Sequence, residues 1–164
     1  MSFGLAVLTF VHVVLSVVGI ASGFVVVYEF LTAKQRDLWT PIFLSTTVLT
    51  SVTGFFFPVE QFLPSHAVGI VSLLVLGVAI AARYGFHLSR AWRPAYVVPS
   101  VIALYLNVAV LVIQLFRKVP ALHVMAPTQS EPPFLATQIA VLALFIVLAI
   151  ATVGRFRNPQ KRMV

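Results

Sequence analysis

Two histidines are the side chains of this sequence best suited to chemistry. His12 lies inside an apolar stretch near the N-terminus, and His66 stands at the start of a later one. Imidazole nitrogens ligate haem iron, copper and zinc, and they also hydrogen-bond quinones and relay protons. A membrane redox protein that binds haem b, a metal ion or a quinone through His12 and His66 is therefore one hypothesis. The sequence contains no cysteine, which excludes thiolate metal sites and c-type haem attachment.

Both histidines also have a purely structural interpretation. His12 can bond a hydroxyl or carbonyl group of a neighbouring helix, and His66 can lie in interfacial water beside Ser65, the expected cap of its helix. Glu131 and Gln138 follow later in the chain and are expected on the same side of the membrane. The sequence leaves open whether these side chains converge on one pocket.

Polar side chains inside apolar stretches form a second candidate site. Asn107 is its strongest member, because an unpaired amide in the middle of a membrane is costly and must face protein or trapped water. The predicted polar site, within the membrane or at its outer face, consists of Ser16, Thr46, Thr50, Asn107, Gln114, Glu131 and Gln138. Such groups either form the seams between packed helices or line a pathway for a small solute. A small-solute carrier or channel is thus a further hypothesis.

The elements that must position these residues are apolar helices. Of the 164 residues, 60% are hydrophobic and only 9% are charged, and the mean hydropathy is +1.05. A soluble domain carries roughly 25% charged residues, because its surface must be wetted by water. The chain is therefore expected in a lipid bilayer, where roughly 20 apolar residues form a helix that crosses the ~30 Å hydrocarbon core.

Five transmembrane helices are expected, and no soluble domain. They cover residues 3–30, 40–57, 65–86, 94–116 and 131–154, and a basic tail follows at 155–164. Residues 119–130 are expected to form the longest loop, and Thr40 is expected to cap the second helix. The predicted fold is all-α, with residues 1–164 forming a single compact bundle.

One face of the first helix is lined with small and hydroxyl side chains. Thr9, His12, Ser16, Gly19 and Gly23 follow one another at intervals of three and four residues, so they share a face of an α-helix. Membrane helices approach one another closely through such residues. The pattern predicts a packing face.

The basic residues predict the orientation. Nine of the eleven Lys and Arg residues lie around the ends of the first, third and fifth helices, while Arg117 and Lys118 follow the fourth. Because basic residues gather on the cytoplasmic side, the N-terminus is expected outside and the C-terminus in the cytoplasm. The basic residues are interpreted as topology signals and lipid-headgroup partners. No nucleic-acid motif occurs, so no nucleic-acid partner is expected.

Three stretches carry a resemblance to other proteins. Residues 43–55 (FLSTTVLTSVTGF), 103–107 (ALYLN) and 126–134 (APTQSEPPF) resemble stretches of an uncharacterised group of small polytopic inner-membrane proteins of bacteria. The resemblance implies a multi-pass protein of the bacterial cytoplasmic membrane. It brings no activity, cofactor or catalytic residue.

The leading hypothesis is a non-catalytic packing or accessory subunit. Small-residue faces dominate the polar pattern of the sequence, and no nucleophile motif or phosphate-binding glycine loop occurs. Such a subunit would pack within the lipid bilayer against a second copy of itself or against a larger membrane complex. The redox protein and the solute carrier or channel remain as alternatives.

Overall fold

The described part of the chain is built from helices and contains no strand, as the sequence predicts. The computed structural model describes residues 3–32, 38–58, 64–89 and 92–157, and these ranges contain no strand. The elements are α1 (Phe3–Thr32), α2 (Trp39–Gly54), α3 (Pro64–Ile80), the π-helical turn η1 (Ala81–Gly85), α4 (Trp92–Lys118), α5 (Pro120–Met125) and α6 (Pro132–Arg157). Lys34, Arg36, Arg90 and tail residues 158–164, which contribute to the predicted charge pattern, lie outside the described ranges.

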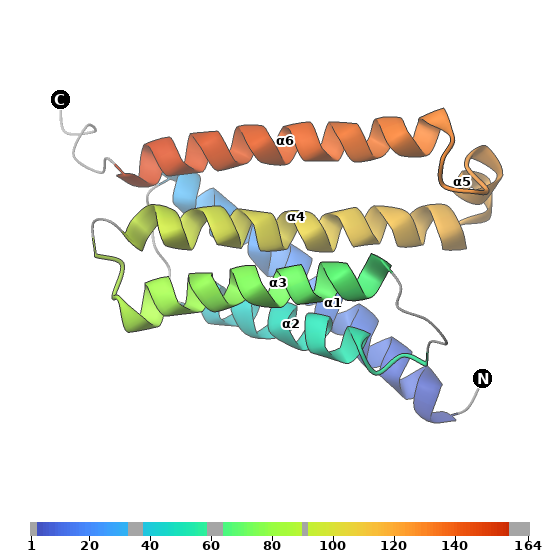
Figure 1. Cartoon of the computed structure of the whole chain (residues 1–164), viewed down its shortest axis with the longest axis horizontal. Helices are drawn as coiled ribbons and strands as arrows, with labels where there is room; N and C mark the ends of the chain where they lie inside the picture. Colours follow the sequence, from blue (N-terminus) through green and yellow to red (C-terminus); the bar gives the residue numbers. More distant parts are fainter. Residues whose placement is uncertain (1–2, 33–37, 59–63, 90–91, 158–164) are drawn as a thin grey trace.

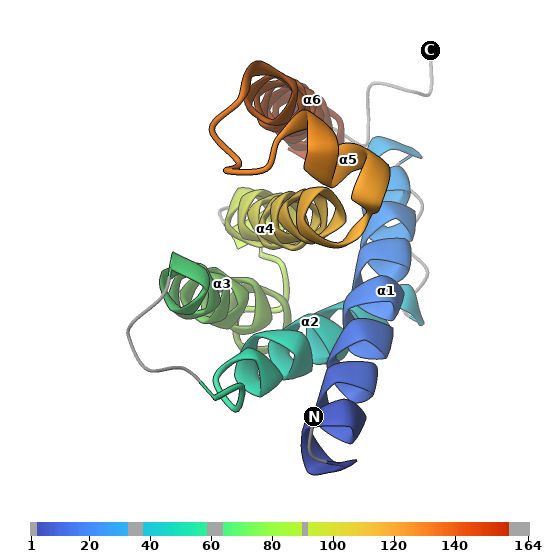
Figure 2. The same ribbon diagram turned by 90° about the vertical axis from the view of Figure 1, so that its right-hand side faces the viewer.

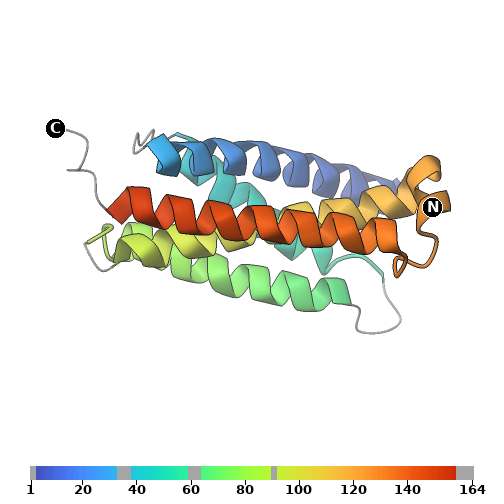
Figure 3. The ribbon, with the colours of Figure 1, turned by 90° about the horizontal axis from the view of Figure 1, so that it is seen from above.

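The long helices run back and forth between the two ends of one bundle. α4 lies between α3 and α6, antiparallel to both, and α1 crosses this group obliquely (Figure 1). Seen from the end, α2 lies between α1 and α3 (Figure 2). The first residues of α1 and the last residues of α6 lie at opposite ends of the bundle (Figure 3).

Four stretches of the described chain are long and apolar enough to cross a membrane. They are Phe3–Thr32, His66–Gly85, Trp92–Lys118 and Pro132–Arg155. Their outward faces are apolar: Phe10 and Ile150 are 70% exposed and Leu74 is 67% exposed. Apolar surface of this extent is stable against lipid and unstable against water. These features fit a multi-pass membrane bundle.

The second expected crossing is shorter than the other four. α2 contains 16 residues, which extend over about 24 Å at ~1.5 Å per residue, less than the ~30 Å hydrocarbon core. By length, α2 is therefore not among the candidate spans. The helix ends at Gly54 instead of residue 57, because the backbone turns at Phe55 and Phe56.

Several local expectations need correction. α2 begins at Trp39, so Thr40 lies inside the helix; its hydroxyl bonds the Tyr96 hydroxyl of α4 at 3.0 Å and does not cap the helix. α3 begins at Pro64, which leaves Ser65 inside that helix as well. The region expected to be a long loop, residues 119–130, contains α5, with Pro120 in its first turn.

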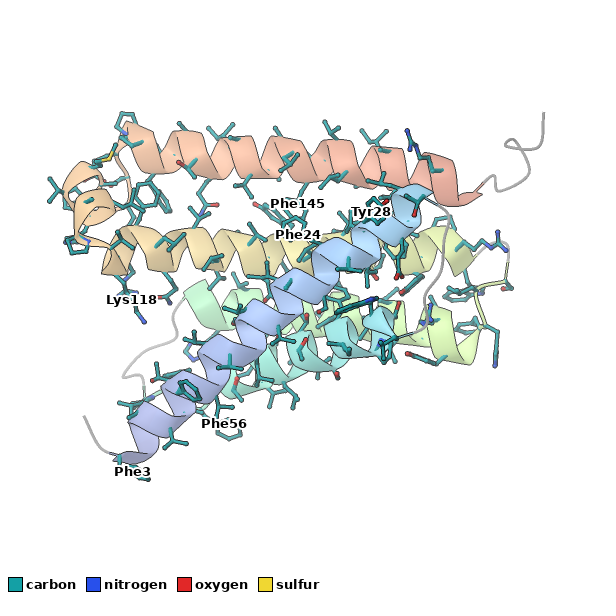
Figure 4. The ribbon with its side chains drawn as sticks, turned by 180° about the vertical axis from the view of Figure 1, so that it is seen from behind. Phe3, Phe24, Tyr28, Phe56, Lys118 and Phe145 are labelled. Atoms are coloured by element: carbon teal, nitrogen blue, oxygen red, sulfur yellow. The ribbon has the colours of Figure 1, made fainter. Side chains whose placement is uncertain are left out.

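The small-residue face of α1 is a packing face inside this chain. Gly23 lies against α2 and α4: a Cβ on it would stand 2.9 Å from Phe43 Cε2 and 2.6 Å from Leu104 Cδ1. Only a residue without a side chain allows this approach. Farther along α1, Phe24 meets Phe145 of α6, with ring centroids 6.2 Å apart (Figure 4).

Candidate functional site

His12 of α1 contacts residues at the C-terminal end of α2 and just beyond it. Its Nδ1 lies 2.9 Å from Thr53 Oγ1, and its ring meets Phe57 edge to face with centroids 5.2 Å apart. The Thr53 hydroxyl donates to the Leu49 carbonyl at 2.8 Å. When it does so, Nδ1 must donate to Thr53, and Nε2 is left as the acceptor of the ring. His12 thus forms the kind of contact across a helix seam that the structural interpretation predicted.

His66 meets the same turn of α2 through a different residue. Its ring lies 5.7 Å from that of Phe55, tilted by 36°. Both imidazoles therefore reach the segment 53–57, where His12 contacts Thr53 and Phe57 and His66 contacts Phe55. Within the described ranges, no group of three or more His, Asp and Glu residues is arranged to hold a metal ion.

A polar cluster surrounds Gly19 where α1, α2 and α4 meet. The position that a Cβ would take on Gly19 lies 3.2 Å from Thr47 Oγ1, 3.3 Å from Thr46 Oγ1 and 3.5 Å from Asn107 Nδ2. Thr46 and Asn107 were predicted as site residues, and the structure brings them together here. Ser16 is half-buried one helical turn before Gly19.

Three polar atoms of this region are buried without a hydrogen-bond partner. They are Thr47 Oγ1, Thr50 Oγ1 and Asn107 Nδ2. The other short hydroxyl side chains in the same part of α2 behave differently, because Ser45, Thr46, Ser51 and Thr53 each donate to the carbonyl one turn earlier; the bonds are 2.6, 2.6, 3.0 and 2.8 Å long.

Thr47 is the functional candidate that the sequence reasoning missed. It is fully buried, while the neighbouring Thr46, which was selected, satisfies its hydroxyl within its own helix. A signal was present, because Thr47, Thr50 and Gly54 share a helical face. What the spacing could not reveal is that this face turns toward Asn107.

The remaining predicted residues do not join this cluster. Gln114 is exposed on α4. Gln138 of α6 donates from Nε2 to the Ala109 carbonyl of α4 at 3.1 Å. Gln129, which the sequence analysis did not select, donates in the same way to the Ile113 carbonyl at 3.0 Å. These amides connect α6 and the segment before it to α4, so they stabilise the hairpin that the two helices form.

Glu131 organises the connection that precedes α6. Its carboxylate accepts hydrogen bonds from Thr128 N at 3.0 Å, Thr128 Oγ1 at 2.8 Å and Ser130 N at 3.1 Å. Partial burial raises the pKa of Glu131, but these hydrogen bonds outweigh it, and the pKa lies below its ordinary value. A carboxylate that stays ionised in this way is suited to fixing a loop.

The opposite end of the bundle is aromatic and basic. The Arg83 guanidinium lies over the rings of Tyr84 and Tyr96, 5.6 and 5.4 Å from their centroids. The rings of Phe86 and Trp92 stack in parallel at 3.7 Å. Aromatic and basic side chains of this kind anchor membrane proteins at the headgroup level.

The comparisons with known proteins give no relative. No family model matches the chain, and no curated protein or solved structure matches it either.

Proposed function

We propose that the chain is a five-pass protein of the bacterial cytoplasmic membrane, with its N-terminus outside and its C-terminus in the cytoplasm. Four long apolar stretches support a multi-pass arrangement. α2 is proposed as the fifth crossing, because it lies within the bundle between α1 and α3 (Figure 2). A helix shorter than the hydrocarbon core is accommodated by local thinning of the bilayer at modest cost. The orientation follows from the nine basic residues on one side against two on the other.

Single cysteines test this topology, since the chain has none of its own. Leu38 precedes α2 and is 65% exposed, and Val124 follows α4 and is 80% exposed. A membrane-impermeant maleimide should label Val124→Cys in intact cells, and Leu38→Cys only after permeabilisation. Equal behaviour of the two positions, both labelled or neither labelled in intact cells, would mean that α2 does not cross. The reverse pattern would invert the orientation.

Within the membrane we infer a non-catalytic accessory role. The observation that carries this proposal is that His12 and Tyr96, whose side chains are of types used in catalysis, form hydrogen bonds between helices. His12 is engaged with Thr53 at 2.9 Å, and the buried Tyr96 hydroxyl is engaged with Thr40 at 3.0 Å. Side chains that hold helices together stabilise the bundle and are not presented to a substrate.

An accessory subunit needs a face for its partner, and α3 offers one. Gly19 and Gly23 are used inside the chain, whereas a Cβ on Gly77 would have no atom within 4 Å. The neighbouring Leu74 and Val78 are 67% and 46% exposed. A helix of a second copy, or of a larger membrane complex, can approach closely at such a glycine.

Cross-linking in native membranes tests this partner face. Gly77→Cys should give a cross-linked dimer or an adduct with another membrane protein. Ile150→Cys is the matched control, because Ile150 is 70% exposed on α6, away from α3. Purification in mild detergent as a monomer, with no adduct at either position, would count against the accessory role.

A redox protein is the second candidate. The observation in its favour is that His12 and His66 contact the same turn of α2, through Phe57 and Phe55. Imidazoles from two helices at one level of a membrane bundle are the arrangement that b-type haem requires. The absorption spectrum and the metal content of the purified protein test this candidate directly.

A further inference from the structure

The middle of the α1–α2–α4 interface contains hydrogen-bonding capacity that the described residues do not use. Thr47 Oγ1, Thr50 Oγ1 and Asn107 Nδ2 are buried and have no partner. Thr47 has 0% and Thr50 6% of its surface exposed. An unpaired polar atom costs more in a membrane than in a soluble core, because no bulk water reaches it when the chain fluctuates.

Thr47 and Thr50 differ in their hydrogen bonding from Thr46 of the same helix and from Thr152 of α6. A serine or threonine in a membrane helix ordinarily satisfies itself by donating to the carbonyl one turn earlier. Thr46 does so at 2.6 Å and Thr152 at 2.7 Å. Thr47 and Thr50 do not make this bond, so their hydroxyls remain available to a group outside the helix.

Gly19 lets the backbone of α1 approach two of these polar atoms closely. The position of its absent Cβ lies 3.2 Å from Thr47 Oγ1 and 3.5 Å from Asn107 Nδ2. The two unpartnered atoms therefore approach the same side-chain-free surface of α1.

We propose that Thr47, Thr50 and Asn107, covered by Gly19, form a buried site that binds a small neutral molecule through an acceptor oxygen. The Asn107 amide nitrogen can only donate, and the two hydroxyls can donate or accept, so the ligand must offer an acceptor. None of these residues is charged, which favours a neutral ligand over an ion. Water is the smallest molecule of this class and makes about three hydrogen bonds when buried in proteins. A small solute with a carbonyl or hydroxyl oxygen has the same chemistry.

The direction in which a conservative substitution shifts the melting temperature tests this site. Valine has nearly the shape of threonine, so Thr47→Val removes the hydroxyl and little else. If the hydroxyl binds a ligand, its loss lowers the melting temperature by about 2–4 °C, the shift expected for one hydrogen bond in a chain of this size. If the hydroxyl is unpaired and dry, its loss leaves the melting temperature unchanged or raises it.

Thr152→Val is the matched control. Thr152 is also fully buried, but its hydroxyl donates within α6 to Leu148 at 2.7 Å. The melting temperature of Thr47→Val is compared with that of Thr152→Val, and Asn107→Leu is measured beside them. If Asn107→Leu fails to fold, the comparison of Thr47→Val with Thr152→Val is sufficient for the test.

Two preparations distinguish the sources of the ligand. In detergent and buffer alone water is the only candidate, so a lower melting temperature of Thr47→Val there assigns the site to water. A lower melting temperature only in native membranes assigns it to a solute of the cell. A melting temperature of Thr47→Val at or above that of the unsubstituted protein in both preparations, while Thr152→Val lowers it, overturns the proposal. This result is independent of the accessory role, which the cross-linking experiment tests separately.

Discussion

Gly23 of α1 lies so close to Phe43 of α2 that a Cβ on the glycine would stand 2.9 Å from Cε2 of the ring. This contact sets the distance between the two helices. It is continued by Gly19, one turn earlier, which lies against Thr46 and Thr47 of the same helix. The close pairing of α1 with α2 therefore depends on residues that have no side chain.

Substitution of Gly23 by alanine should destabilise the bundle. The added Cβ would also stand 2.6 Å from Leu104 Cδ1, and relief of such overlaps costs about 1–3 kcal/mol. Gly154→Ala in α6 is the control, because its Cβ would meet no atom within 4 Å; it should be neutral or stabilise the helix by at most about 1 kcal/mol. The free energy of unfolding in mixed micelles measures both. Equal effects of the two substitutions would contradict the packing described here.

The bond between Tyr96 and Thr40 should contribute measurably to stability. Both side chains are buried and their hydroxyls lie 3.0 Å apart. Tyr96→Phe keeps the ring and its edge-to-face contact with Phe30, removes the bond, and should cost about 1 kcal/mol. Tyr28→Phe, in a side chain that is 65% exposed, should change the free energy of unfolding very little. A smaller loss for Tyr96→Phe than for Tyr28→Phe would show that the buried bond is not stabilising.

The bond between His12 and Thr53 should stabilise the seam between α1 and α2. Loss of an interhelical hydrogen bond in a membrane costs about 0.6 kcal/mol on average and at most about 2 kcal/mol. His12→Leu should lose an amount in this range, and Thr53→Val should add little once His12 is gone. Thr9→Val serves as the control on α1, since the Thr9 hydroxyl donates to Leu5 within its own helix. Additive effects of His12→Leu and Thr53→Val would argue against a direct bond.

Absorption spectroscopy separates the two functional candidates. The accessory role predicts no Soret band and no stoichiometric metal in the purified protein. The redox candidate predicts a Soret band that is lost in both His12→Leu and His66→Leu. A band that survives both substitutions would assign any haem to other residues.

The connection before α6 should loosen in acid. Glu131 accepts bonds from Thr128 and Ser130, and these hold its pKa below the ordinary value. A lowered pKa in the folded state stabilises the connection above the pKa of the unfolded chain, and that contribution is lost as the pH falls through the lowered pKa. Proteolysis within residues 126–131 should therefore accelerate as the pH falls below the ordinary pKa of a glutamate. Glu131→Gln should remove this pH dependence; cleavage of the variant with an unchanged pH profile would exclude Glu131 as the cause.

Some of this architecture follows from composition and spacing alone. A chain with 9% charged residues cannot cover a globule with polar surface, so its long apolar stretches become helices in lipid. The spacing of Gly19 and Gly23 was enough to predict a packing face, because residues three or four apart share one side of a helix. Helix ends do not follow from residue type in the same way. Threonine is a common capping residue, but the Thr40 hydroxyl bonds Tyr96 of α4.

Tertiary structure decided which faces meet. The sequence marks Asn107 as costly and the threonines of α2 as polar, but only the meeting of α1, α2 and α4 shows that Thr47 rather than Thr46 keeps an unused hydroxyl. It likewise shows that Glu131 bonds Thr128, and Gln138 the Ala109 carbonyl, within the α4–α6 hairpin. Periodicity determines which residues share a face of their own helix. Which neighbour that face meets depends on packing between distant segments, and no local pattern records it.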